Sequence, residues 1–275
     1  MPESDPASAV APVVAAVLAS RRYRHVDPAT VERIAREQLA AAGGRVPDAV
    51  KRSKRALHQV FGAYLPQPPR YARLTAQIEA ATDEEARRAA LRRAMAQHVS
   101  TRERLDYLDP FYETLREHMG QPASVLDLAC GLGPLASPWL GLRPGAAYHA
   151  WDIDHALIEF VGHSLRGLGM EAHGAVIDLL AVPQWPDTEV ALVLKTLPCL
   201  EQQRAGASEA LLRTIPARRI VVSFPTRSLG GRAKGMGQTY ARRFEQLLDG
   251  LGWTAASFEV GPELVYVVQR PSTPG

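Results

Sequence analysis

The sequence contains few cysteines and no long apolar run. Its two cysteines, Cys130 and Cys199, cannot make a disulfide framework, and neither has His or Cys neighbours at the spacing of a zinc site. The longest apolar run, 9–19, is roughly half of the ~20 residues that a membrane-spanning helix needs. Glu3 and Asp5 precede it without any Lys or Arg, the reverse of a secretory leader. We therefore expect a cytoplasmic protein with reduced thiols, no membrane span and no metal site.

Lysine is also scarce, and the charges are unevenly distributed. Only 4 of the 32 basic residues are Lys, a bias that codon usage in a GC-rich genome explains. Residues 1–104 carry 18 basic and 11 acidic side chains, whereas residues 105–275 carry 14 and 18. A basic part beside a near-neutral one is typical of a nucleic-acid-binding extension on a catalytic domain, although solvated helix faces produce the same pattern. The composition, 46% hydrophobic and 22% charged, is that of a folded protein.

The first 104 residues predict helices. Asp27-Pro28 is a helix start, and apolar residues then recur at helical spacing up to Gly43-Gly44. We expect a second helix from Asp48, and two more over 71–82 and 83–98. The second helix carries Lys51, Arg52, Lys54 and Arg55 in its first turns. Cations at a helix N-terminus oppose the helix dipole, so their position favours a polyanionic partner.

From residue 105 onward, short apolar runs alternate with helical stretches, which indicates a parallel α/β sheet. The predicted strands are 124–128, 147–151, 172–177, 190–194 and 219–224, followed by a hairpin of 255–260 and 263–269 around Gly261-Pro262. Five such units closed by an antiparallel pair favour the methyltransferase variant of the doubly wound fold over a dinucleotide dehydrogenase. We divide the chain into a helical domain, 1–104, and an α/β domain, 105–275.

Aspartates end three successive predicted strands. The first strand runs through Asp127 into a turn containing Gly131, with no third glycine to complete a dinucleotide fingerprint. Asp152 lies 21 residues after Gly131, where a carboxylate can accept hydrogen bonds from both ribose hydroxyls of an adenosine. Asp178 ends the third strand, where its carboxylate could accept a hydrogen bond from the amino group of a bound adenine. Each aspartate alone is consistent with a helix cap or turn, but together they favour S-adenosylmethionine over NAD.

Several segments resemble the aminoglycoside-resistance methyltransferases of 16S ribosomal RNA, in particular those of actinomycete producers. The resemblance rests on Ala129-Cys130-Gly131-Leu132, on 194–201 and on 223–236, and extends upstream to 62–64 and 98–105. It spans most of the chain, from Val31 to Tyr266. It implies a class I S-adenosylmethionine-dependent fold, methylation of N7 of guanosine 1405 within the 30S subunit, and resistance to gentamicin- and kanamycin-type drugs.

The same resemblance implies a set of cofactor contacts. The methionine end is assigned to Tyr64, His98, Ser100 and Arg104, the turn to Ala129 and Gly131, the ribose to Asp152, and the adenine to Asp178 and Leu179, with Leu194 and Gln203 as further contacts. Residues 100–103 also fit a capping box, so Ser100 is equally a candidate helix start. Gly133 replaces the Asn that is usual in the family, so another group must order this loop.

For the target, the resemblance implies recognition by Lys195, Arg232 and Met236. Arg227, Arg232 and Lys234 form a basic, glycine-rich loop suited to binding phosphates, and the first 104 residues add Lys51, Arg52, Lys54 and Arg55 as RNA contacts. Guanine N7 is a lone-pair acceptor without a proton, so no catalytic base is expected. Because the guanosine lies within folded RNA, we expect its base to be extruded by a monomeric enzyme.

Three other functions are compatible with these residues. The first is methylation of N1 of a neighbouring adenine in the decoding site, which gives a different resistance spectrum. The second is a ribosome-binding protein that uses the same scaffold without turnover. The third is a small-molecule methyltransferase, which would not need the basic helical domain.

Overall fold

The computed structural model describes residues 6–181, 184–226 and 234–270. The amino-terminal elements are α1 (Pro6–Leu18), α2 (Pro28–Ala41), α3 (Val46–Leu57), the π-helical turn η1 (His58–Gly62), α4 (Tyr71–Glu79), α5 (Glu84–Met95) and α6 (Val99–Arg104). The later helical elements are η2 (Leu105–Tyr107), α7 (Leu108–Met119), η3 (Gly133–Ala136), α8 (Ser137–Leu140), α9 (His155–Gly167), α10 (Leu197–Gln203), α11 (Ala207–Thr214) and α12 (Lys234–Leu251). The strands are β1 (Ser124–Leu128), β2 (Ala147–Asp152), β3 (Glu171–Val176), β4 (Val190–Leu194), β5 (Arg219–Pro225), β6 (Thr254–Val260) and β7 (Glu263–Gln269).

The strands form one seven-stranded sheet in the order β3-β2-β1-β4-β5-β7-β6. The first five are parallel, and β7 pairs antiparallel with both β5 and β6. The predicted doubly wound sheet with a terminal hairpin is therefore confirmed, and the bounds of β1, β4 and β7 agree with the predicted ones. In the hairpin turn Gly261 has φ +56°, and an added Cβ would lie 2.7 Å from the Tyr107 ring. Only glycine combines this backbone conformation with such close packing.

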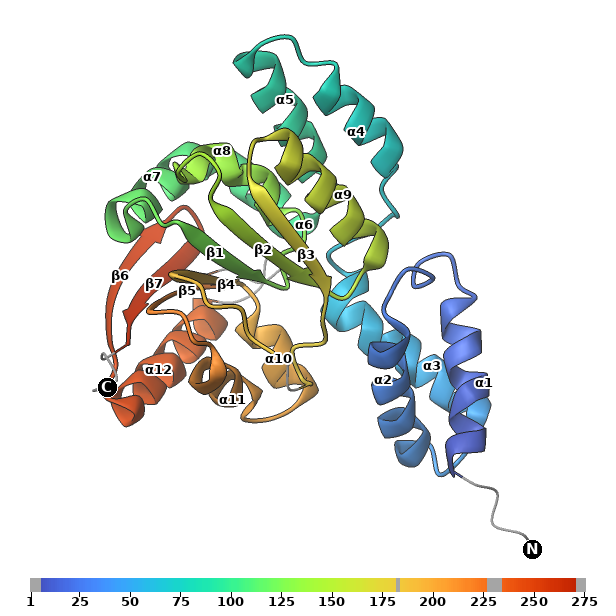
Figure 1. Cartoon of the computed structure of the whole chain (residues 1–275). Coiled ribbons are helices and arrows are strands. Elements are labelled where there is room, and N and C mark those ends of the chain that lie inside the picture. Colours follow the sequence, from blue (N-terminus) through green and yellow to red (C-terminus); the bar gives the residue numbers. More distant parts are fainter. Residues whose placement is uncertain (1–5, 182–183, 227–233, 271–275) are drawn as a thin grey trace, which may run out of the picture.

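Helices cover both faces of the sheet (Figure 1). On one face, α7, α8 and α9 pack with the pair α4–α5 over one apolar cluster that contains Phe111, Tyr148 and Phe160. On the other face, α10, α11 and α12 surround a second cluster with Leu212 and Phe244. The alternation of strand and helix in the sequence produces these layers, because each crossover helix buries its apolar stripe against the sheet.

The amino-terminal helices form two separate groups. Helices α1, α2 and α3 pack on one another as a bundle beyond the carboxyl ends of β2 and β3, whereas α4 lies along α9 and α5 packs on α4 and η3 (Figure 1). The apolar run 9–19, which is too short to span a membrane, belongs mostly to α1. In the structure α1 buries Val13 and Val17 completely, in the same cluster as the sheet residues. No helix within the described ranges is long and apolar enough to span a membrane.

Two local expectations are corrected. Helix α3 begins at Val46 rather than Asp48, because Pro47 occupies the first turn, where its missing N–H is not needed. Lys54 and Arg55 then lie in the last turn, where a positive charge interacts favourably with the helix dipole. The prediction that all four cations oppose the dipole is therefore wrong. The Asp27 cap is confirmed, since its carboxylate accepts from the Thr30 N–H at 2.8 Å.

Candidate functional site

A pocket opens at the carboxyl ends of the parallel strands. Nine of the eleven predicted cofactor residues line it: Tyr64, His98, Ser100, Ala129, Asp152, Asp178, Leu179, Leu194 and Gln203. The two that do not line it are Arg104 and Gly131. Lys195 contributes to the wall as well. The walls therefore come from both sides of residue 104, and the helical part of the chain is built into the site.

The turn after β1 positions the next strand's aspartate. Ala129 and Gly131 have φ of 50° and 51°, in the left-handed region. The Gly131 N–H donates to Asp152 Oδ2 at 2.9 Å, and an added Cβ on Gly131 would lie 2.9 Å from the His98 ring. Gly131 thus allows His98 to pack against the turn and orients Asp152, although it does not itself line the pocket.

Asp152 ends β2 with its carboxylate held by the backbone. Oδ1 accepts from the Ile153 N–H at 2.7 Å and Oδ2 accepts from Gly131, which leaves further lone pairs for a ligand. Burial raises the pKa of Asp152 to about 6, and these backbone N–H groups oppose part of the shift. At neutral pH the group is a carboxylate that can accept from two vicinal hydroxyls.

His98, Ser100 and Tyr64 form one side of the pocket. The Ser100 hydroxyl and His98 Nδ1 are hydrogen-bonded at 2.9 Å, and the Tyr64 and His98 rings stack with centroids 5.8 Å apart. The helix start lies at Val99 with His98 at the cap position, so the capping box at Ser100 is not formed. Burial and the charges of Lys195 and Arg104 lower the pKa of His98 to about 3. His98 is therefore neutral at physiological pH.

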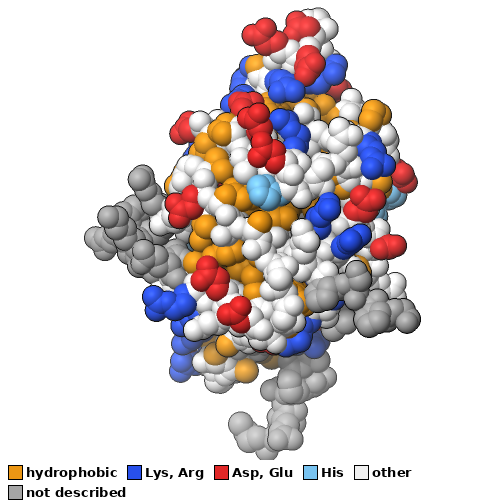
Figure 2. Space-filling view, turned by 90° about the vertical axis from the view of Figure 1, so that its left-hand side faces the viewer, with side chains coloured by type: hydrophobic (Ala, Val, Ile, Leu, Met, Phe, Trp, Pro, Cys, Tyr) orange, Lys and Arg blue, Asp and Glu red, His pale blue; other side chains and the backbone are white. Residues whose placement is uncertain are grey.

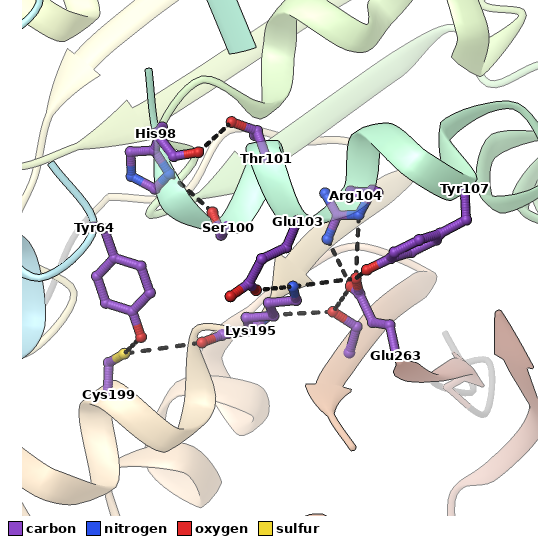
Figure 3. A network of polar contacts seen from close by, with 11 residues as sticks. Tyr64, His98, Ser100, Thr101, Glu103, Arg104, Tyr107, Lys195, Cys199 and Glu263 are labelled. Carbon is purple, nitrogen blue, oxygen red and sulfur yellow. Dashed lines mark hydrogen bonds and ion pairs between the residues drawn. The ribbon is translucent and has the colours of Figure 1, made fainter. Parts of the chain in front are cut away.

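A buried carboxylate, Glu263, organises the polar groups beside this wall (Figure 3). It is 0% exposed and accepts from Arg104 Nη2 at 2.6 Å, Arg104 Nε at 3.2 Å, the Tyr107 hydroxyl at 3.2 Å and the Ser223 hydroxyl at 2.5 Å. Burial alone would raise the pKa of Glu263, but the charges of Arg104 and Lys195 overcome this effect and lower the pKa to about 2. The carboxylate is thus ionised and fully engaged.

This network changes the position expected for Arg104. The family resemblance assigns Arg104 to the methionine end of the cofactor, whereas its guanidinium is 3% exposed and paired with Glu263. A buried guanidinium requires an anionic partner, and Glu263 supplies one from a strand 159 residues away. In the sequence, Glu263 is only the first residue of the predicted strand 263–269, and no local signal gives it a role.

Lys195 joins the network from the end of β4. It is 7% exposed, and its Nζ lies 3.1 Å from Glu103 Oε2 and 3.5 Å from Glu263 Oε2 (Figure 3). Its backbone has φ +58°, a conformation that costs a non-glycine residue about 1–3 kcal/mol, and its N–H donates to the Ser223 carbonyl at 3.0 Å. The strained backbone and the ion pairs hold this ammonium at the pocket wall.

Elsewhere in the pocket wall, Asp178 and Gln203 are joined by Arg33, a residue that the sequence did not predict for the site. Arg33 of α2 lines the pocket and donates through Nε to Asp178 Oδ2 at 2.6 Å and through Nη2 to Gln203 Oε1 at 3.0 Å. In the sequence Arg33 is an ordinary helix-face residue four positions before Glu37, and no local signal places it beside Asp178. Only the position of the bundle brings them together.

A backbone hydrogen bond orders the loop at Gly133, where the family usually has Asn. The Gly133 N–H donates to the Cys130 carbonyl at 2.9 Å, which closes the turn without a side chain. An added Cβ at Gly133 would lie 3.3 Å from Asp127 Oδ2, so a larger residue would press on a buried carboxylate.

The basic residues of the helical part differ in whether their side chains pair with an acidic residue. In α5, Arg88 pairs with Glu84, Arg92 pairs with Asp109, and both guanidinium groups lie over the Trp139 ring at 4.9 and 5.5 Å. The four predicted RNA contacts of α3 are Lys51, Arg52, Lys54 and Arg55. Lys54 is half-buried and the other three are exposed, and within the described ranges none of the four pairs with an acidic residue. The cations of α3 are thus available to a polyanion, whereas Arg88 and Arg92 stabilise the fold.

One side of the molecule faces away from the bundle. Figure 2 shows this face, where apolar side chains form a central band and acidic and basic side chains are interspersed around it. The edge strand β6 lies on this side, with Ala255 and Ala256 exposed and Phe258 stacked on His118 at 4.9 Å.

Part of the predicted target-binding loop is not described. Arg227 and Arg232 lie outside the described residues. Lys234 and Met236 belong to α12, but their side chains are outside the description as well. Their assignments remain predictions.

Comparison with known proteins agrees with this geometry. A family model described as "Ribosomal RNA methyltransferase (FmrO)" matches residues 19–267. A relative from Micromonospora echinospora, named 16S rRNA (guanine(1405)-N(7))-methyltransferase, is 49% identical over 98% of this chain and 100% of its own length. One of the same name from Serratia marcescens is 35% identical over 92% of this chain and 96% of its own.

Solved structures show the same architecture. The 16S rRNA methyltransferase RmtF, in complex with S-adenosyl-L-homocysteine, superposes with a TM-score of 0.84 at 33% identity and covers 98% of this chain and 99% of its own. The 16S rRNA methylase RmtB superposes with a TM-score of 0.78 at 30% identity, covering 95% of this chain and 98% of its own.

Proposed function

This chain belongs to the FmrO family of ribosomal RNA methyltransferases, and from that premise we propose that it methylates N7 of guanosine 1405 of 16S rRNA with S-adenosylmethionine as donor. The observation that carries the proposal is the pocket at the strand ends, which Asp152 and Asp178 both line, in a chain 49% identical to a relative named for this reaction. The solved RmtF structure, which contains S-adenosyl-L-homocysteine, supports the choice of cofactor.

The residues of the pocket fit this cofactor. Asp152 offers carboxylate lone pairs to the two ribose hydroxyls, and Asp178 offers an acceptor to the adenine amino group, with Leu179 and Leu194 as apolar neighbours. The turn at Gly131 leaves no room for a side chain. At the methionine end the wall consists of Tyr64, His98, Ser100, Ala129 and Lys195, while Arg104 acts on this wall through Glu263.

The chemistry requires positioning more than proton transfer. When bound, S-adenosylmethionine supplies an electrophilic methyl group on a sulfonium. The guanine N7 carries no proton, so no residue has to act as a base, and the neutral His98 need not change its protonation state. The task of the chain is to orient the base, exclude water and stabilise the charge distribution as charge moves to the purine. Lys195 is held at the pocket wall and is the proposed contact for the incoming base, together with Arg232 and Met236.

The proposed substrate is the assembled 30S subunit. The unpaired cations of α3 provide a docking surface for phosphates on one side of the pocket, and Arg227, Arg232 and Lys234 provide further contacts. The enzyme acts as a cytoplasmic monomer without metal and extrudes the guanine from the folded RNA. Its product confers resistance to gentamicin- and kanamycin-type aminoglycosides.

The alternatives are not favoured. The relatives are named for guanine N7 rather than adenine N1. A non-catalytic protein would have no need for the strained Lys195 and the oriented Asp152 carboxylate. A small-molecule enzyme would have no need for unpaired cations along α3.

The test is a methylation map. Purified protein is incubated with radiolabelled S-adenosylmethionine and with 30S subunits, naked 16S rRNA or buffer, and the RNA is then treated with borohydride and aniline. We expect label and a single cleavage at guanosine 1405, with subunits preferred to naked RNA. Asp152→Asn should abolish the signal, whereas Glu113→Gln, at an exposed position of α7, should not change it. Label without aniline cleavage would move the target to adenine N1, and no label would favour the non-catalytic alternative.

A further inference from the structure

Helix α2 of the amino-terminal bundle forms part of the cofactor pocket. Thr30 and Arg33, both from α2, line the pocket beside Asp152 and Asp178. The chain entering α2 is hydrogen-bonded to the chain leaving β2, because the Asp27 N–H donates to the Ile153 carbonyl at 2.8 Å. The bundle is thus attached at the adenosine end of the site.

Arg33 connects three elements at this end. Its guanidinium binds Asp178 after β3, Gln203 at the end of α10, and Glu37 on its own helix, the last at 3.3 Å. The side chains of Arg33 and Asp178 are only 19% and 13% exposed, so their ion pair is shielded from solvent. Arg36, three residues further along the helix, is 64% exposed, and among the described residues it pairs only with Glu32 of the same helix. Arg33 is therefore the arginine of α2 whose interactions cross to the α/β part.

The contacts of Arg33 determine how Asp178 can act. Asp178 Oδ2 accepts from Arg33, and Oδ1 accepts from the Leu180 N–H at 2.9 Å. Each oxygen keeps a lone pair, so the carboxylate can still accept from an amino group while its rotation is fixed from both sides. Without Arg33, the carboxylate would lose one of these two donors and its cationic partner.

We propose that Arg33 is a positioning residue for adenine recognition, supplied by the amino-terminal bundle, which orients Asp178 toward the exocyclic amino group of the cofactor. This inference rests on the proposed cofactor. It predicts that Arg33 contributes specifically to the discrimination of adenine from a purine that lacks the amino group, rather than to cofactor binding in general.

The experiment measures binding of two ligands by calorimetry: S-adenosylhomocysteine and its 6-deamino analogue, in which hydrogen replaces the amino group. We expect the wild-type protein to prefer S-adenosylhomocysteine by about tenfold or more, the fold-change of a charge-assisted hydrogen bond. Arg33→Ala should bind the natural ligand about fivefold more weakly and the analogue about as well as wild type does, so a tenfold preference falls to about twofold. Arg33→Lys should show an intermediate preference, because an ammonium cannot engage both acceptors with a planar fork.

Arg36→Ala is the matched control and should retain the wild-type preference. The inference is overturned if Arg33→Ala keeps the full preference, if it weakens both ligands equally, as a merely structural residue would, or if the wild-type protein shows no preference. The readout is independent of RNA methylation. A wild-type protein that shows the preference but leaves guanosine 1405 unmodified contradicts the proposed function alone, whereas one that binds neither ligand contradicts both.

Discussion

Removing the charge of Glu263 should destabilise the protein strongly. Glu263→Gln keeps the size of the side chain and part of its hydrogen bonding but leaves Arg104 and Lys195 buried, at 3% and 7% exposure, without their shared anion. Breaking a buried pair by removing one partner costs about 3–5 kcal/mol. The pKa of Glu263 leads to a similar value: a shift from 4.5 to about 2 corresponds to about 3 kcal/mol, at about 1.4 kcal/mol per unit. We therefore expect the free energy of unfolding at pH 7 to fall by roughly 3 kcal/mol.

The pH dependence provides an independent test of the same reasoning. Because the pKa is lower in the folded state, the stabilisation is fully present above the unfolded value of about 4.5 and is lost as the pH falls through about 2. The difference between wild type and Glu263→Gln should therefore narrow progressively below pH 4.5. Urea unfolding followed by tryptophan fluorescence at pH 7 and at lower pH values measures both quantities.

A matched control is available on the neighbouring strand. Glu259 of β6 is exposed, so Glu259→Gln should change the free energy of unfolding by less than about 0.5 kcal/mol. The account of the network is refuted if Glu263→Gln costs less than about 1 kcal/mol, or if its cost is independent of pH between 7 and 3.

Three further predictions concern the pocket, the sheet and the bundle. Asp152 has a raised pKa of about 6 and must be ionised to accept from the ribose, so the affinity for S-adenosylhomocysteine should fall as the pH drops below 6; calorimetry should show this fall in wild type and not in Asp152→Asn. Burial raises the pKa of Asp127 to about 7, so folding favours its protonated form, and the stability contributed by this group decreases as the pH rises from about 4 to 7. In thermal unfolding, Asp127→Asn should therefore gain more stability relative to wild type at pH 8 than at pH 5. Replacing Lys51 and Arg52 by Ala should weaken 30S binding and reduce its salt dependence, with little change in melting temperature. Arg92→Ala should instead lower the melting temperature and leave the affinity for the 30S subunit unchanged. Filter binding measures the affinities, and thermal scans measure the melting temperatures.

The order of the elements and the general location of the site are local properties of the sequence. Alternating apolar runs and helical stretches predicted the sheet with its terminal hairpin, and the bounds of β1 and β4 agree with the structure. Aspartates at the ends of β2 and β3 pointed to an adenosine site, because parallel strands bring their carboxyl ends to one edge. The start of α3 differed by two residues, since Pro47 outweighed Asp48 as the first-turn signal.

The sequence by itself therefore determined the fold class, the sheet edge that carries the pocket, and most of its wall, because backbone periodicity and strand-end residues depend only on near neighbours in the chain. The tertiary structure alone decided which buried charges meet. Arg104 pairs with Glu263 rather than lining the pocket, and Arg33 reaches Asp178 across 145 residues. Such pairs depend on how a helical bundle and a closing hairpin pack against the sheet, and a charged side chain removed from water binds the counter-charge that packing brings within reach.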